Sequence, residues 1–459
     1  MTVDPRRTAL GLGRFGLGAR PGDLARDEPV EEILRREVLA AVVPMPGGPD
    51  LAAAPTLLSA LRAEEQARKL ARAGSPDGPM PAGPPAPPIP ERTYRAEVAA
   101  RLALAQAAPV GFVERLVWFW ANHFTVSVAR GPQLRVSAGA FEREAIRPHV
   151  LGRFRDLLLA AATHPAMLIY LDNVASVGPN SPAGQRRGAG PGKGLNENLG
   201  RELLELHTLG ADGGYGQDDV TALARILTGW SLQRDGNAEG LPGATAFRRG
   251  AHEPGAVTLM GRTYLDIGPE QLPMALADLA AHPATARHVA FRLARHFVAD
   301  DPPPALVARL ARTFTDQDGD LSRLALTLLE SPEAWDPVQR KVRSPQEFVV
   351  AAMRGLALAP DPRLAMAGLA SLGQPFWSAP APNGYPDEAG TWASPEGLRT
   401  RLDVAARTGQ LAAGTDPTAF ADAVLGPLAT DETRTALRRA ESRAQGIALV
   451  LMAPEFQRR

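Results

Sequence analysis

The sequence predicts a mainly α-helical protein, and two observations carry this prediction. Apolar residues recur three and four positions apart in long segments such as 31–42, 57–73 and 94–108, which is the period of a helix with one buried face. Helix-start signals with proline at the first helical position occur at Ser344-Pro345-Gln346-Glu347 and at Ser394-Pro395, whereas strand-like alternation is scarce. We therefore expect one large body of about 15–20 helices.

One segment, residues 246–265, departs from the helical pattern. Two short runs rich in β-forming residues flank His252-Glu253-Pro254-Gly255, a sequence typical of a turn. The pattern predicts a single small β-hairpin attached to the helical body.

Two segments rich in proline and glycine indicate how the chain is organised. Residues 74–91 are too rich in these residues to be helical, and they predict a linker between an N-terminal helical subdomain, 1–73, and a main domain, 92–459. Residues 178–194 predict a flexible basic loop. That loop is either a lid or entrance for an anion, or a solvated loop with incidental charges.

Composition excludes several classes of function. With 50 basic and 50 acidic residues, the chain has no net charge to attract nucleic acid or an anionic membrane surface. Cysteine is absent, so a metal site must rely on His, Asp, Glu or Asn. No apolar run reaches the length of a membrane span and no export signal is visible, so we expect a cytoplasmic protein, with an exported form left open.

The densest cluster of polar residues lies in 196–230. On a regular helix Asn198, Arg201, Glu202 and Glu205 fall on one face, whereas His207 falls among leucines on the other. Two interpretations are open. In the first, the carboxylates of Glu202 and Glu205 share a site that holds a cation or a proton. In the second, the four residues form an ordinary solvated face of the helix.

A histidine within the aromatic segment 118–124 is the second candidate for chemistry. His123 is either a core histidine bonded to a carboxylate or carbonyl, or a metal ligand or general base beside Asn122. His207 and His252 complete a three-histidine set, although the spacing matches no compact metal-binding motif.

Blocks spread over the whole chain resemble the bacterial family called domain of unknown function 1800. They are Phe15-Gly16, 118–124 (WFWANHF), 146–149 (IRPH), 164–167 (HPAM), 196–210 (NENLGRELLELHTLG), 227–230 (LTGW), 282–286 (HPATA), 295–303 (RHFVADDPP), 344–348 (SPQEF) and 454–459 (PEFQRR). The resemblance implies no settled activity. It implies a sulfatase-like companion protein of the family called domain of unknown function 1501, and it implies export signals, which this chain does not show.

Two functional hypotheses follow. In the first, the protein is a metal-assisted hydrolase that uses a divalent metal. The predicted catalytic residues are Glu202, Arg201 and His123, the substrate-binding residues are Asn122, Asn198, Trp230 and Glu205, and the metal ligands are His123, His207 and His252. In the second hypothesis, the protein is a non-catalytic binding or assembly protein that acts with the sulfatase-like companion.

Overall fold

The computed structural model of the chain describes residues 3–40, 43–48, 50–73, 87–187, 194–234 and 240–459. These residues are mainly α-helical, which confirms the predicted fold class. The helices of the first half are α1 (Pro5–Arg14), α2 (Val30–Leu39), α3 (Ala54–Ala73), α4 (Ile89–Ala107), α5 (Phe112–His123), α6 (Pro132–Phe141), α7 (Phe154–Thr163), α8 (Pro165–Tyr170), α9 (Pro182–Arg187), α10 (Asn198–Glu202) and α11 (Gln217–Leu227).

The second half adds a further series of helices, two of which, α18 and α23, are a single turn long. The series consists of α12 (Gln271–Ala281), α13 (Pro283–Phe297), α14 (Pro304–Asp316), α15 (Leu321–Glu330), α16 (Pro345–Gly355), α17 (Pro362–Ser371), α18 (Ala389–Trp392), α19 (Pro395–Leu411), α20 (Pro417–Val424), α21 (Asp431–Arg438), α22 (Arg443–Met452) and α23 (Pro454–Gln457). The described helices therefore run to α23, beyond the predicted number, because many prolines start new short helices.

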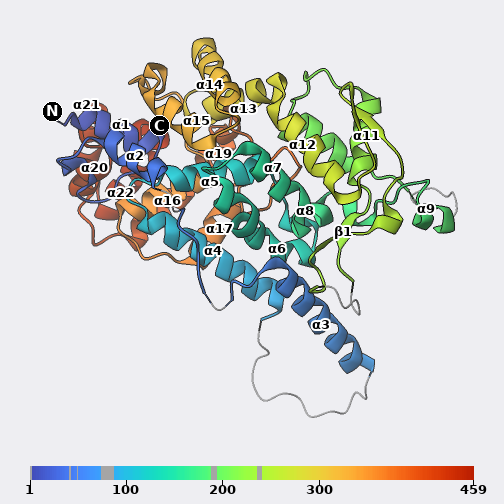
Figure 1. Cartoon of the computed structure of the whole chain (residues 1–459). Helices are drawn as coiled ribbons and strands as arrows, with labels where there is room; N and C mark the ends of the chain where they lie inside the picture. The colour runs from blue at the N-terminus through green and yellow to red at the C-terminus, as the bar shows by residue number, and fades with distance from the viewer. Residues whose placement is uncertain (1–2, 41–42, 49, 74–86, 188–193, 235–239) are drawn as a thin grey trace.

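The two ends of the chain lie close together. Figure 1 shows α1 and α2 beside α20 and α22, whereas α11 lies at the opposite end of the molecule. Helix α5 runs through the middle, so its polar residues lie within the body of the protein.

The first helices share a core with the rest of the described chain. The Phe15 ring, directly after α1, lies 5.8 Å from Phe112, 6.3 Å from Phe297 and 4.9 Å from Trp335. Helix α3 packs on α6 through a small apolar cluster. The proposed boundary at residues 74–91 stays a prediction, and residues 74–86 lie outside the described part of the chain.

A small β-hairpin lies within residues 246–265, as predicted, but the described chain has a second strand pair as well and the turn of the hairpin lies elsewhere than expected. Strand β1 (Trp230–Leu232) pairs with β2 (Thr245–Phe247), and β3 (Val257–Leu259) pairs with β4 (Arg262–Tyr264), both antiparallel. The hairpin turn is at Met260 and Gly261, with φ values of 49° and 76°. Two positive φ values are what a tight hairpin requires, so the turn forms there rather than at residues 252–255.

The segment expected to be a regular helix over residues 196–208 contains a π-helical turn. The α-helical part ends at Glu202, and Leu203–His207 is π-helical. The wider turn changes the direction of the later side chains relative to a regular helix. His207 is buried, as predicted, and its ring lies 5.0 Å from that of Phe124.

Two other local predictions can be compared with the structure. Ser344 and Glu347 form the predicted capping box, since each side chain accepts from the backbone N–H of the other. The predicted flexible loop at 178–194 contains α9, and its residues 188–193 lie outside the described chain. No described helix is long and apolar enough to cross a membrane.

Candidate functional site

A small cavity of about 60 Å³ lies where α5, the start of α16 and the segment 374–392 meet. Pro386 is the exposed residue on its rim. The aromatic residues of the wall are Trp118, Trp377, Tyr385 and Trp392. The charged and amide side chains of the wall are Arg101, Arg115, Asn122, His296, Gln346, Glu347, Gln374, Asp387 and Arg459.

Glu347 is the central anion of this wall. Its carboxylate lies 2.5 Å from a guanidinium nitrogen of Arg115 and 2.9 Å from Nε of Arg459. It also accepts from the backbone N–H of Ser344 at the start of α16. Burial alone would raise the pKa of Glu347, but Arg115 and Arg459 lower it to about 2, so the carboxylate is ionised at neutral pH.

A histidine and an aspartate form a second pair beside Glu347. Nδ1 of His296 lies 2.7 Å from Oδ1 of Asp387, and Nε2 lies 3.2 Å from Arg115. Burial lowers the pKa of His296, which Asp387 only partly offsets, so the ring is neutral at pH 7. Nδ1 then donates to Asp387 and Nε2 accepts from Arg115.

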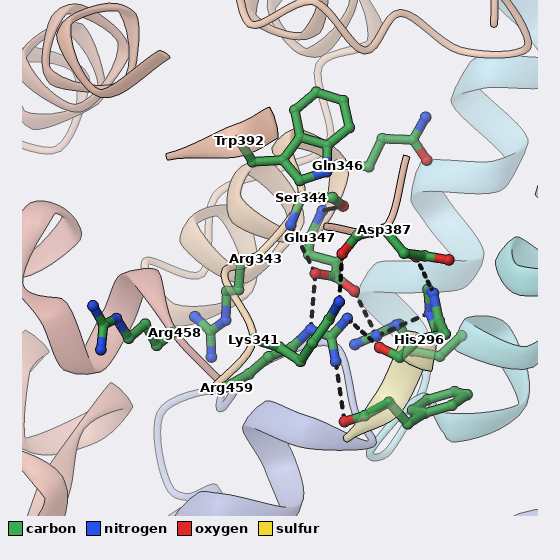
Figure 2. Close-up of polar contacts among 12 residues, drawn as sticks. His296, Lys341, Arg343, Ser344, Gln346, Glu347, Asp387, Trp392, Arg458 and Arg459 are labelled. Carbon is green, nitrogen blue, oxygen red and sulfur yellow. Dashed lines mark hydrogen bonds and ion pairs between the residues drawn. The ribbon is translucent and has the colours of Figure 1, made fainter. Parts of the chain in front are cut away.

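Figure 2 shows Glu347, His296, Asp387 and Arg459 pointing toward one another, together with Lys341. Lys341 donates to the backbone carbonyl of Asp387 and pairs with Asp300. The network therefore ties together segments that are far apart in the sequence.

A separate buried carboxylate, that of Glu142, supports two residues of the cavity wall. Glu142 accepts from Arg101 at 2.9 Å and from the indole Nε1 of Trp377 at 3.1 Å. Trp377 has a φ of 45°, which costs strain for a bulky residue. Strained backbone of this kind concentrates at functional sites, and the indole bond to Glu142 helps to hold it.

Several buried donors around the cavity have no hydrogen-bond partner in the protein. They are Nε1 of Trp118, Nε of Arg101 and Nε of Arg115, all on residues that line the cavity. Each of these residues is more than nine-tenths buried. A buried donor without an acceptor is costly, so the arrangement suits a guest molecule that brings acceptor atoms.

Asn122, which was predicted to bind substrate, lines this cavity, but its side-chain amide is hydrogen-bonded to the protein backbone. Nδ2 donates to the carbonyl of Tyr385 at 2.9 Å, and Oδ1 accepts from the N–H of Tyr385 at 2.7 Å. Asn122 thus fixes the segment that carries Tyr385 and Asp387 to the end of α5.

His123 and His207, predicted as metal ligands, are neighbours in the core. Their ring centroids are 5.9 Å apart, and Nε2 of His123 lies 3.1 Å from the carbonyl of His207. Burial lowers the pKa of both rings, that of His207 to about 3. Within the described ranges there is no group of three His, Asp or Glu residues that could hold a metal ion.

His252 and Trp230 lie together in another part of the structure. The ring of Phe247 lies 5.7 Å from Trp230 and 5.0 Å from His252. Nδ1 of His252 lies 2.8 Å from the carbonyl of Thr228. The three predicted histidines are therefore not brought to one centre.

Asn198 and Glu202 line a second cavity, of about 290 Å³, with Tyr170 and Asp172. Burial and the charge of Glu205 raise the pKa of Glu202.

The other two polar residues predicted around this helix have protein partners. Arg201 bonds to Glu197 and Gln217, and the carboxylate of Glu205 lies 3.4 Å from the hydroxyl of Tyr215. The predicted polar face is thus divided between a cavity and the surface.

The interpretation of the sequence missed Arg115, His296, Glu347, Asp387 and Arg459. One signal was present, since Glu114 and Arg115 interrupt an otherwise apolar helix, FVERLVWFW. Charges in such a run are costly unless they are paired, which indicates a buried network. Nothing in the spacing of Asp387 or Arg459 indicates that they reach the same place.

The fold and the site define a mainly α-helical protein with a buried, arginine-rich cavity. Four of the blocks that carry the family resemblance contribute to its wall, namely 118–124, 295–303, 344–348 and 454–459.

The chain matches the family described as Protein of unknown function (DUF1800) over residues 11–458, and it belongs to this family. No curated protein and no solved structure matches it.

Proposed function

We propose that the protein binds a small polar molecule in the cavity between α5, α16 and residues 374–392. The observation that carries the proposal is the set of unpartnered donors on Trp118, Arg101 and Arg115. A ligand with acceptor oxygens satisfies these donors, and the aromatic walls pack against its apolar atoms. The space of about 60 Å³ accommodates roughly four to six water-sized groups, so the enclosed part of the ligand is small.

Binding without catalysis fits this geometry better than hydrolysis. His296 Nε2, the atom that a general base needs free, lies 3.2 Å from Arg115 and accepts from it. Glu347 is held by two arginines, so neither carboxylate nor imidazole is free to attack or to take a proton. The proposal agrees with the second hypothesis, and assembly with a sulfatase-like companion stays part of it as a prediction from the resemblance.

Hydrolysis is the second candidate function, and one observation favours it, although that observation supports proton transfer by a histidine and not the metal of the first hypothesis. The His296–Asp387 pair has the arrangement by which a carboxylate orients an imidazole for proton transfer. Hydrolysis by this pair requires that substrate draws Arg115 away from Nε2. The metal ligands predicted for this function, His123, His207 and His252, do not meet at a common centre, so the metal part of the hypothesis has no support from the geometry.

Two tryptophan substitutions test the binding proposal. Trp118→Phe removes an indole donor that has no protein partner, whereas Trp335→Phe, outside the cavity wall, removes one that donates to the carbonyl of Leu329 at 2.7 Å. Melting temperatures are measured with acetate, phosphate, acetamide and glycerol. We expect at least one probe to stabilise the wild type and to bind Trp118→Phe about fivefold to tenfold more weakly, the size of one hydrogen bond.

Trp335→Phe should lower the melting temperature of the free protein but keep the stabilisation by the probe. If crystals soaked in each of the four probes show none of them in the cavity, and no melting temperature changes, the binding proposal is wrong.

A further inference from the structure

The side chains around Glu347 carry more positive than negative charge. The buried cations are Arg115, Lys341, Arg343, Arg401 and Arg459. The anions that face them are Asp300, Glu347 and Asp387. Five cations against three anions leave the cluster positive, and it stays positive if a main-chain carboxylate at Arg459 is counted as well.

Two of these cations, Arg343 and Arg401, form no ion pair with a carboxylate in the described part of the chain, and Arg401 bonds instead to Gln457 and to the carbonyl of Arg343. Arg343 is 6% exposed, its Nη1 has no hydrogen-bond partner, and its guanidinium lies 4.7 Å from the centre of the Phe456 ring. Burial lowers the pKa of Arg343 to about 10, so the group is still charged at pH 7. An unpaired buried charge is costly, and the cost falls when an anion binds nearby.

The free donors at the cavity wall suit the same kind of partner. Nε of Arg115 and Nε1 of Trp118 are donors only, so they recognise oxygen acceptors and not other donors. Hydrogen bonds from a guanidinium to a charged oxygen are about twice as strong as bonds between neutral groups. Charge and donor placement therefore select the same ligand chemistry.

We infer that the ligand of this cavity carries an oxyanion, a carboxylate or a phosphate, which binds beside Arg115 and Trp118 at the positive cluster. This inference rests on the proposed function, because it names the chemical class of the ligand in the same cavity. A carboxylate and a phosphate offer the same acceptors, and their sizes distinguish them in a space of about 60 Å³.

The test measures binding of acetate, inorganic phosphate and sulfate by isothermal titration calorimetry at constant ionic strength, with chloride as the reference anion. Acetamide, which has the shape of acetate without its charge, is the matched neutral probe. We expect acetate to bind at least tenfold more tightly than acetamide if the ligand is a carboxylate, and phosphate or sulfate to exceed acetate if the ligand is tetrahedral.

Two charge variants give opposite expected effects. Glu347→Gln removes an anion of nearly the same shape, so it should tighten anion binding about tenfold even though it lowers the stability of the free protein. Arg343→Gln removes an unpaired cation and should weaken anion binding by a similar factor, with little loss of stability. Arg458→Gln changes an exposed arginine next to Arg459 and should leave the affinity unchanged.

The outcomes separate the inference from the proposed function. If acetamide or glycerol binds in the cavity and the anions bind no more tightly, the oxyanion inference is wrong and the binding function stands. The inference is also wrong if Glu347→Gln weakens anion binding or if Arg458→Gln weakens it as much as Arg343→Gln. If no probe, neutral or anionic, binds, both proposals are wrong.

Discussion

At the scale of single residues, Glu347 determines much of the site. It is 5% exposed and joins Arg115 of α5, Arg459 near the end of α23 and the first turn of α16. The attraction of two guanidinium groups offsets the cost of burying its charge. The residue is thus both a helix cap and the centre of an ion-pair network.

Glu347→Ala should lower the free energy of unfolding by about 3–5 kcal/mol, because two buried arginines lose their carboxylate. Urea unfolding at pH 7 measures the loss. Glu330→Ala is the control, since Glu330 forms an exposed pair with Arg35 that contributes at most about 1 kcal/mol. Equal losses in the two variants would show that the Glu347 network does not stabilise the fold.

Acid should remove the same contribution. The pKa of Glu347 is about 2 in the folded protein and near 4.5 in the unfolded chain. A carboxylate with a depressed folded pKa stabilises the protein fully above the unfolded value and loses that effect as the pH falls from about 4.5 to 2. The difference in unfolding free energy between the wild type and Glu347→Gln should therefore shrink across this window, as measured by urea titrations at each pH.

His207 predicts a second pH effect, at higher pH. Its pKa is lowered to about 3 by burial, and its two ring nitrogens have no partner. The unfolded chain takes up a proton near pH 6.5, so the folded state loses about 2 kcal/mol between pH 7.5 and 5 through this residue. His207→Leu should remove that part of the loss and cost little at pH 7.5, which urea unfolding at both values tests. An unchanged pH dependence would contradict the assignment.

At the scale of elements, the segment 374–392 depends on one glycine for its path. Gly384 has a φ of 78°, and a Cβ there would lie 2.4 Å from the carbonyl oxygen of Asn122. The close approach lets Asn122 bond both polar groups of the Tyr385 backbone. Without it, Tyr385 and Asp387 would leave the cavity wall.

Gly384→Ala should therefore destabilise the protein by about 2 kcal/mol or more, through backbone strain and the steric clash. Thermal unfolding and binding of the probes measure the effect, and we expect both to fall. Gly390→Ala is the matched control in the same segment, because a Cβ at Gly390 would contact nothing within 4 Å. If Gly384→Ala is as stable as Gly390→Ala, the close approach to Asn122 is not required.

At the scale of the whole molecule, residues near both ends of the chain complete a common structure. Phe15 packs against rings from α5, α13 and residue 335, and Arg459 donates to the backbone carbonyl of His296 at the end of α13. Removing either contact should therefore lower the stability of segments that are distant in the sequence.

Phe15→Ala should cost about 3–5 kcal/mol, the usual loss for a buried phenylalanine. If the predicted subdomain 1–73 and the main domain form one cooperative unit, calorimetry should show a single transition that moves to lower temperature. A separate N-terminal subdomain, as the segment 74–91 suggests, would instead leave a main transition at its wild-type temperature. The experiment therefore tests the domain boundary directly.

The fold class could be predicted from the sequence, and most of the candidate site could not. Helical periodicity and the capping box at Ser344 depend on neighbours within a few residues, so the sequence contains them directly. The hairpin within residues 246–265 was predicted, but the position of its turn was wrong, because Met260 gives no turn signal in the sequence and adopts a φ of 49° all the same. The π-helical turn after Glu202 was not predicted either. The local sequence gives no signal for it, because tertiary packing selects it.

The sequence by itself determined the helices, their starts, the burial of His207 and the family of the chain. Only the tertiary structure decided which polar residues meet. His123, His207 and His252 were separated into two places, while Arg115, His296, Glu347, Asp387 and Arg459 were brought together from segments up to 344 positions apart. The physical reason is that the spacing of apolar residues along a helix indicates which of its faces is buried. The partner of a buried charge depends instead on how distant elements pack together.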